Sequence, residues 1–362
     1  MRAITIGVDL AKQTFSTCEV DASGRVVRRK DFGREGFAAW LAQVPAGAVV
    51  AMEACGSAHH WARRCLEYGA VPKLMAAPKV VPFRKSRTTK NDRNDAEAIA
   101  TAARQGNMCF VPVKSVDQQA RLSCHRVREG YKVQALAIAN RMRGLLAEFG
   151  IAVAHSNAAL RRVLGDSAVR SKLPAPMPEL LDELKQQWLE VSKLLAGCEA
   201  RIARHARADD RCVRSQRIIG VGSLTADAVV ATVGTAKEFR NGRQFAAWVG
   251  LTPMQYSTGG RTRLGPISCR GDTYLRTLLI QGARSSLRLA QAVAPERATP
   301  EQIWIQQLAD RLPFGKLVVA IANKHARQLW AILAHGEDYD PHAWMKHPMV
   351  QRAAVHPRAA AA

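Results

Sequence analysis

Residues 3–32 read AITIGVDLAKQTFSTCEVDASGRVVRRKDF, and this stretch decides the fold of the first part of the chain. Apolar and β-branched residues recur over 3–9, 14–20 and 26–32 in the manner of strands. The segment Asp21-Ala-Ser-Gly24 predicts a turn between the last two of them. The sequence therefore opens with three consecutive strands.

Helices and strands then alternate. Helical spacing of apolar residues over 37–44 leads into the apolar strand 49–52, which ends at Glu53. A helix over 57–68 and a strand over 71–75 complete the pattern. This βββαβαβ order predicts a mixed sheet with flanking helices, an α/β fold of the ribonuclease-H type.

The rest of the chain is predicted to be helical. Helices are expected over 92–104, 116–149, 180–206, 224–233 and 273–289, with Pro174-Ala-Pro-Met-Pro178 as the clearest break. The expected apolar stripe of the longest helix is Leu122, Val133, Leu136, Ile138, Met142, Leu145 and Leu146. The near-heptad spacing over 180–206 fits either a coiled coil between subunits or a helix packed within one chain.

These elements suggest how the chain is divided. We expect an α/β domain over 1–115, an all-α long-helix and coiled-coil region over 116–210, a helical domain over 211–340 and a disordered tail over 341–362.

The composition predicts a polyanionic partner. The 362 residues include 53 Lys and Arg against 30 Asp and Glu, a formal charge of +23 that a polyanion would use; a merely solubilising surface is the alternative. No apolar run approaches the roughly 20 residues that span a bilayer, and the N-terminus lacks a secretory signal, so we expect a cytoplasmic protein without membrane contact. Eight cysteines without a Cys-x-x-Cys pair predict reduced thiols.

The segment Lys90-Asn-Asp-Arg-Asn-Asp-Ala-Glu-Ala98 sets two carboxylates three residues apart at a helix start. Residues three apart share a helical face, so Asp92 and Asp95 can point at one metal ion. Asp9 and Glu53 end two strands and can complete a group of four acids that holds divalent ions such as Mg²⁺ for phosphoryl transfer. Taken singly, each acid can instead be a cap or part of a solvated first turn.

The acids lie inside a basic surround. Residues 79–143 contain fourteen Lys or Arg and five acids. Lys90 and Arg93 are placed to meet phosphate, which favours a magnesium site for phosphate chemistry over a solvated helix end.

A Gly-x-Gly turn opens a later helix. In Arg217-Ile-Ile-Gly-Val-Gly-Ser223, the backbone N–H groups at Gly220 and Gly222 can approach phosphate oxygens, as in helix-hairpin-helix elements. A purely structural turn explains a lone Gly-x-Gly equally well.

A glycine-rich loop carries a candidate nucleophile. Residues 252–265, TPMQYSTGGRTRLG, place Ser257 near Arg261 and Arg263, and Arg270 follows. A serine hydroxyl assisted by a base or metal can attack DNA while guanidinium groups hold the phosphate; a simple turn is the alternative. No catalytic-triad order or Walker segment is present, which disfavours a serine hydrolase or a P-loop ATPase.

Five short runs of the sequence together resemble the DEDD transposases of the one-ten family of bacterial insertion sequences, and their one-triple-one subgroup in particular. The resemblance extends from Ile4 to about Tyr339. It rests on residues 90–100 (KNDRNDAEAIA), 110–115 (FVPVKS), 143–150 (RGLLAEFG), 257–260 (STGG) and 322–327 (ANKHAR).

The resemblance implies an N-terminal RuvC-like domain whose acids Asp9, Glu53, Asp92 and Asp95 bind Mg²⁺. It also implies a C-terminal transposase domain in which Ser257 forms a transient phosphoserine link to DNA. A non-coding bridge RNA would pair with donor and target DNA, and homodimers would assemble into homotetramers. The protein would act in the bacterial cytoplasm, associated with the nucleoid.

Two positions depart from the family pattern, which often has Lys after the STGG loop and again in an Ile-Ser-Lys segment. Arg261 and Cys269 stand there in this chain. Arg keeps the charge and adds bidentate phosphate binding, whereas Cys269 removes a cation. These two changes affect the predicted contacts of the loop with the DNA backbone, but they do not affect the choice of Ser257 as the nucleophile. Ser268 and Thr258 are weaker candidates for that role.

The sequence therefore predicts a site-specific recombinase, an insertion-sequence transposase that cuts and rejoins DNA. One alternative is a RuvC-like junction-resolving endonuclease that uses metal-activated water and needs Ser257 only structurally. The other is a non-catalytic nucleic-acid-binding protein, for which a metal site would have no purpose.

Overall fold

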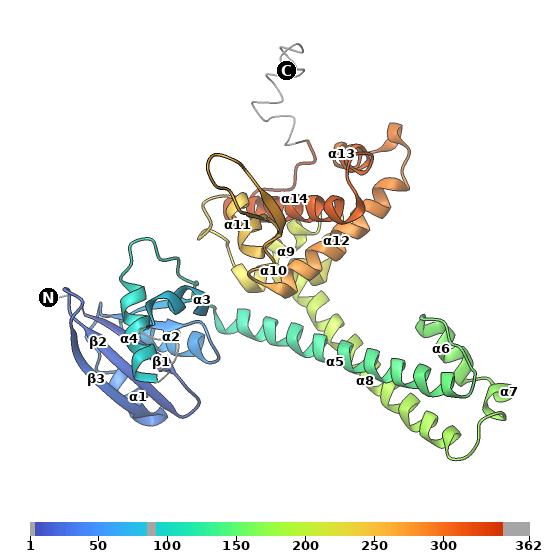
Figure 1. The fold of residues 1–362 in the computed structure, drawn as a ribbon, viewed down its shortest axis with the longest axis horizontal. Coiled ribbons are helices and arrows are strands. Elements are labelled where there is room, and N and C mark those ends of the chain that lie inside the picture. The colour runs from blue at the N-terminus through green and yellow to red at the C-terminus, as the bar shows by residue number, and fades with distance from the viewer. Residues whose placement is uncertain (1–3, 85–91, 343–362) are drawn as a thin grey trace, which may run out of the picture. The chain divides into compact units, whose positions relative to one another are not determined.

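The computed structural model describes residues 4–84 and 92–342, which belong to two compact units divided after Val116. The N-terminal unit contains a five-stranded mixed sheet with flanking helices (Figure 1). Its strands are β1 (Thr5–Leu10), β2 (Thr14–Val20), β3 (Val26–Gly33), β4 (Val49–Glu53) and β5 (Val71–Met75). Its helices are α1 (Arg34–Leu41), α2 (Ala58–Glu67), α3 (Ala77–Val80), the 3₁₀ helix η1 (Val81–Phe83) and α4 (Asp92–Ala103). The predicted βββαβαβ order is confirmed.

The strand order of the sheet is β3-β2-β1-β4-β5. Strands β1, β2 and β3 pair antiparallel, whereas β4 runs parallel to β1 and to β5. Val8 of β1 pairs with Met52 of β4. The next residues, Asp9 and Glu53, therefore lie side by side at the carboxyl ends of neighbouring strands.

Two layers of helices cover the sheet. Helices α1 and α2 pack on one face, where Phe15, Phe37 and Trp61 form an aromatic core with ring centroids 4.8–5.4 Å apart. Helix α4 packs on the other face through a run of small residues that includes Ala96 and Ala100. Small side chains allow this helix to lie close to the strands.

The long helices of the C-terminal unit are α5 (Val116–Glu148) and α8 (Met177–Ala208), joined through α6 (Asn157–Leu164) and α7 (Ser167–Arg170). They run side by side (Figure 1), and Met142 and Leu146 of α5 share a core with Leu181 and Trp188 of α8. The near-heptad face of α8 is thus packed within one chain.

The predicted stripe of α5 is wrong in part. Ile138, Met142 and Leu146 are buried as expected, but Val133 is 63% exposed and Leu136 is 59% exposed. In the first half of the helix the buried positions are instead Arg121, His125 and Arg128. Polar side chains take the place of apolar ones there: Arg121 and His125 pair with the buried Asp227, and Arg128 pairs with Glu129 and Glu199 nearer the surface.

The remainder of the C-terminal unit is a helical bundle around one apolar core. Its helices are α9 (Asp210–Ser215), α10 (Ser223–Val233), α11 (Gly242–Val249), α12 (Thr273–Gln291), the 3₁₀ helix η2 (Pro295–Arg297), α13 (Pro300–Ala309) and α14 (Phe314–His335). A two-stranded antiparallel ribbon, β6 (Pro253–Gln255) and β7 (Leu264–Ile267), interrupts them. The helical C-terminal region is confirmed, but the predicted loop that carries Ser257 lies between two short strands that the sequence did not predict.

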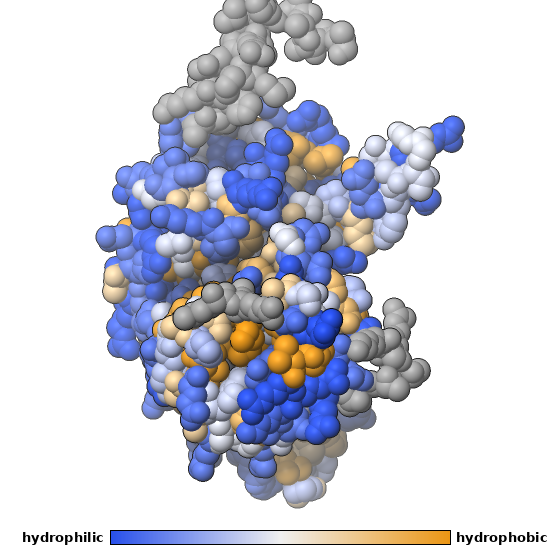
Figure 2. Space-filling model, turned by 90° about the vertical axis from the view of Figure 1, so that its left-hand side faces the viewer, coloured by the Kyte–Doolittle hydropathy of each residue, from blue (hydrophilic) through white to orange (hydrophobic). Residues whose placement is uncertain are grey.

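The surface is largely hydrophilic. Figure 2 shows a face that is mostly polar with small apolar areas, and the edge strand β3 exposes Arg28, Arg29 and Lys30. Within residues 4–84 and 92–342, no helix is long and apolar enough to cross a membrane. The predicted disordered tail lies, from residue 343 onward, outside the described residues.

Candidate active site

The alternation of side chains along the strands decides which face of the sheet carries the acids. Ile6 and Val8 of β1 belong to the core under α1 and α2, so Gly7 and Asp9 face α4. On β4, Ala51 packs against α4, and Glu53 therefore points to the same side. Both strand-end acids lie on the α4 face.

Gly7 permits a very close approach of α4 to β1. A Cβ atom at this position would lie 2.1 Å from the Ala96 carbonyl oxygen and 2.5 Å from the Ala100 backbone nitrogen. No residue with a side chain fits there without moving the helix. The contact brings the first turn of α4, with Asp92 and Asp95, to the end of β1.

The electrostatics of Asp9 reflect this convergence. Burial, and after it the negative charges of Asp92, Asp95 and Glu53, raise the pKa of the Asp9 carboxyl from its ordinary 3.8 to about 6, although Arg84 lowers it. Asp9 is thus within electrostatic reach of the other three predicted acids. A divalent cation would relieve their repulsion.

Arg84, which sequence reasoning did not single out, lies among these acids. Its Nη2 donates to Glu53 Oε1 at 3.2 Å, and its Nε is 3.0 Å from Asp95 Oδ1. In the described part of the chain, no three His, Cys, Asp or Glu side chains are arranged to hold a metal ion. The carboxylate oxygens nevertheless form the donor set that Mg²⁺ prefers.

The two predicted phosphate contacts beside the acids have different outcomes. Lys90 lies outside the described residues. Arg93 is exposed and pairs with Asp31, donating from Nε at 3.0 Å and from Nη2 at 2.7 Å. Contact between Arg93 and a phosphate would require this surface ion pair to open.

Ser257 lies at the tip of the β6–β7 ribbon. Its exposed Oγ accepts a hydrogen bond from Gln255 Nε2 at 2.8 Å and a longer one from the Arg263 backbone N–H at 3.4 Å. Gly259 and Gly260 both have positive φ, of 54° and 79°, and make the tight turn beyond it. The loop therefore contains the tight turn that the sequence offered as the simpler interpretation. The same turn exposes Ser257, whose Oγ accepts hydrogen bonds from Gln255 and from the Arg263 backbone.

Both ends of the ribbon are held by the helical bundle. A Cβ at Gly250 would lie 2.1 Å from the Arg270 carbonyl, and one at Gly271 would lie 1.8 Å from the Trp248 carbonyl. Buried Arg276 donates from Nη1 to the Arg270 carbonyl at 3.2 Å. The Arg270 backbone is therefore fixed, while the side chains of Arg261, Arg263 and Arg270 are exposed around the ribbon.

The Gly-x-Gly turn has a structural explanation for its first glycine. Gly220 has φ of 89°, and a Cβ there would lie 2.2 Å from Ser286 Oγ and 2.4 Å from the Gly282 carbonyl of α12. Gly222 is the N-cap of α10 and has open space around its Cα. Close packing against α12 is thus enough to require a glycine at position 220. Only Gly222 has open space beside it, where a phosphate could approach the backbone.

A buried ion network on α5 was missed by sequence reasoning. Arg121 donates from Nε to Asp227 Oδ1 at 2.9 Å, and His125 lies between Asp227 Oδ2 at 2.8 Å and the Tyr274 hydroxyl at 2.9 Å. Burial opposes the charge of Asp227, but the hydrogen bonds from His125 and Arg121 keep its pKa below the ordinary value. The network ties α5 to the first turns of α10 and α12.

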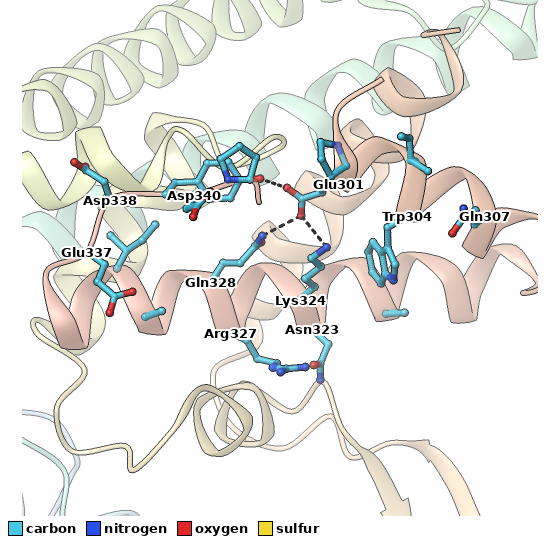
Figure 3. Close-up of a pocket in the computed structure, with 17 residues that line it drawn as sticks. Glu301, Trp304, Gln307, Asn323, Lys324, Arg327, Gln328, Glu337, Asp338 and Asp340 are labelled. Atoms are coloured by element: carbon cyan, nitrogen blue, oxygen red, sulfur yellow. Dashed lines mark hydrogen bonds and ion pairs between the residues drawn. The ribbon is translucent and has the colours of Figure 1, made fainter. Parts of the chain in front are cut away.

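A cavity of about 650 Å³ between α13 and α14 is lined in part by Asn323, Lys324 and Arg327 of the ANKHAR run (Figure 3). Glu301, only 1% exposed, accepts hydrogen bonds from Gln328 and from the Tyr339 hydroxyl. The Lys324 ammonium lies 3.8 Å from the same carboxylate and 4.1 Å above the Trp304 ring. These contacts pair most of the polar groups of the wall with one another, although the buried Gln328 Oε1 has no hydrogen-bond partner in the described part of the chain.

Comparisons with known proteins define the class. Residues 6–151 match a transposase family named for the DEDD transposases of IS110, and residues 214–297 match the "Transposase IS116/IS110/IS902 family". The first match spans the acids, and the second spans Ser257. The chain thus has the two regions of an insertion-sequence transposase, a DNA-processing enzyme.

Full-length relatives make the assignment specific. The chain is 45% identical to a probable family 20 transposase of Pseudomonas aeruginosa over 94% of this chain and 100% of that protein. It is 37% identical to the transposase for IS1111A of Coxiella burnetii (92% of this chain, 90% of that protein) and 34% identical to the transposase for IS1328 of Yersinia enterocolitica (91% and 97%). The protein belongs to the IS116/IS110/IS902 family of transposases.

Proposed function

We propose that this transposase cuts and rejoins DNA with a RuvC-like acid site and a serine nucleophile. The single observation that supports the proposal is that the Asp9 carboxyl, at the end of β1, lies within electrostatic range of Glu53, Asp92 and Asp95. Four carboxylates crowded in one place cost stability unless a cation and a reaction use them. Mg²⁺ bound by these residues would supply the positive charge that orients a scissile phosphate.

Ser257 is the proposed nucleophile. Its oxygen attacks phosphorus and loses its proton, while the bond from phosphorus to a sugar oxygen breaks and that oxygen takes up a proton. The resulting phosphoserine conserves the energy of the phosphodiester, so a sugar hydroxyl of the partner strand can reverse the step without ATP. Gln255 and the Arg263 N–H hold the serine oxygen, and they would stabilise it as it becomes a leaving group again.

The proposed partners are donor and target DNA and a bridge RNA. The formal charge of +23 supports a nucleic-acid partner, and contacts are proposed for Lys90, Arg93, Gly220, Gly222, Arg261, Arg263 and Arg270. A homodimer that assembles into a homotetramer, acting in the cytoplasm on the nucleoid, completes the proposal. Sequencing the RNA that co-purifies with the protein tests its guide component directly.

A cell-based excision and joining assay tests the mechanism. Ser257→Ala and Asp92→Asn should each abolish activity, whereas Asp92→Asn should leave RNA binding largely intact because phosphate contacts by Lys and Arg are a separate electrostatic interaction. Full activity of Ser257→Ala would eliminate the serine mechanism. Membership of a transposase family does not favour the junction-resolving endonuclease.

A further inference from the structure

The guanidinium of Arg84 lies where two of the proposed metal ligands meet. Arg84 follows η1, whose Phe83 packs against the α4 core, so the residue is held beside the acids by its own backbone. Its side chain is 28% exposed and contacts Glu53 (17% exposed) and Asp95 (9% exposed). One monovalent cation thus bridges carboxylates from a strand and a helix.

We propose that Arg84 is a positioning residue that holds the acid site together in the metal-free protein and competes with the divalent ion for Glu53 and Asp95. This inference rests on the proposed function, because it assumes that the four acids bind metal. The Arg84 guanidinium opposes the entry of a divalent cation by its charge and by its contact with one oxygen of each carboxylate, and so lowers the metal affinity of the site.

The geometry of the contact favours an exchangeable pair over a permanent one. Arg84 Nε is buried and lies 3.0 Å from Asp95 Oδ1, yet it has no partner in hydrogen-bonding geometry within the described residues. By contrast, Arg121 donates both Nε and Nη2 to Asp227 Oδ1, at 2.9 and 2.5 Å. A buried N–H without an acceptor is costly, so the Arg84 pair is easier to displace than the Arg121 pair.

Competition has a measurable consequence. Mg²⁺ binds carboxylate oxygens at about 2.0–2.1 Å. The Arg84 guanidinium occupies Glu53 Oε1, lies 3.0 Å from Asp95 Oδ1 and repels a second cation at the same carboxylates. Two ligands that exclude each other weaken each other reciprocally, commonly by factors of about 5 to 150. Removing the guanidinium should therefore tighten metal binding by at least about fivefold.

The experiment titrates the full-length protein with Mn²⁺ and follows free Mn²⁺ by electron paramagnetic resonance. Arg84→Gln is compared with wild type and with Arg29→Gln, a matched control that removes an ion pair between Arg29 of β3 and Glu97 of α4; neither residue is among the charges that shift the Asp9 pKa. We expect the Mn²⁺ dissociation constant of Arg84→Gln to fall at least about fivefold, and that of Arg29→Gln to stay unchanged. Asp95→Asn should weaken binding and so locate the ion at the acids.

A second readout follows the thermal unfolding temperature with EDTA and with Mn²⁺. In EDTA, Arg84→Gln should unfold at a lower temperature than wild type, and Mn²⁺ should raise its unfolding temperature by more. Arg84→Lys keeps the charge but bridges the two carboxylates less well, so its unfolding temperatures should lie between those of Arg84→Gln and wild type. Arg84→Lys replaces Arg84→Gln in both measurements if the Gln variant does not fold. Equal or weaker Mn²⁺ binding by the Arg84 variants, with wild type binding normally, overturns the inference alone. Absence of Mn²⁺ binding by all variants and wild type overturns the proposed metal site, and the inference with it.

Discussion

Replacing Asp9 by Asn should stabilise the metal-free protein while abolishing its proposed activity. Burial and three neighbouring carboxylates raise the Asp9 pKa from 3.8 to about 6, which disfavours the charged form by about 3 kcal/mol, at about 1.4 kcal/mol for each tenfold change in acidity. Asn has nearly the same shape without the charge. Above pH 7, Asp9→Asn should therefore gain up to about 3 kcal/mol.

The stabilising effect of Asp9→Asn should depend on pH. Because the folded pKa lies above the unfolded one, the folded state holds the Asp9 proton more tightly between pH 3.8 and about 6. Wild-type stability falls as the pH rises through this window and then levels off. The advantage of Asp9→Asn should be absent near pH 4 and complete above about pH 7.

Scanning calorimetry of the full chain in EDTA, from pH 5 to 8, measures this effect. A change of about 1 kcal/mol in the free energy of unfolding shifts the melting temperature of a domain as large as the N-terminal unit, residues 1–116, by roughly 4 °C. Asp31→Asn is the control of opposite sign, because hydrogen bonds from Arg93 and Ser16 lower the pKa of Asp31 and its loss should destabilise. If Asp9→Asn melted at or below wild type at pH 8 in EDTA, the acids would not be crowded as described.

Three further changes test the fold and the serine. Gly7→Val should destabilise the N-terminal unit by at least about 3 kcal/mol, because its side chain would enter the α4 backbone, whereas Gly33→Ala, with open space, should be neutral; melting temperatures decide this. Asp227→Ala should cost about 3–5 kcal/mol because buried Arg121 keeps Asp209 but loses the acceptor of its Nε and Nη2, and buried His125 loses its carboxylate partner. An unfolding midpoint in urea equal to wild type would contradict this. Gln255→Ala should slow excision by about tenfold or more with DNA binding unchanged in a mobility-shift assay; weaker DNA binding in proportion to the lost activity would argue against its action on Ser257.

Local patterns were enough to predict much of the N-terminal unit. The alternation of apolar residues predicts the strands of the sheet, and the buried side chains of Ile6 and Val8 in β1 are two of these apolar residues. The helix that begins at Asp92 was predicted with its acids in the first turn. The spacing of apolar residues and the residues that begin a helix are properties of short segments, and so they can be recognised in a single sequence.

Long-range pairing could not be predicted in the same way. Arg121 and His125 read as surface residues of a helix until Asp227, about a hundred residues later, is brought against them. Arg84 was counted as one more basic residue because its partners come from β4 and α4. The β6–β7 ribbon was missed because its strands are short and their apolar alternation is weak.

The joint action of Ser257 and the acids is tested most directly by a denaturing gel of labelled donor DNA incubated with protein, RNA and Mg²⁺. A covalent protein–DNA adduct should form with wild type and with the neighbouring control Ser268→Ala, and should be absent with Ser257→Ala and with Asp92→Asn. An adduct that persists in Ser257→Ala, or DNA cut by wild type without any adduct, would contradict the account.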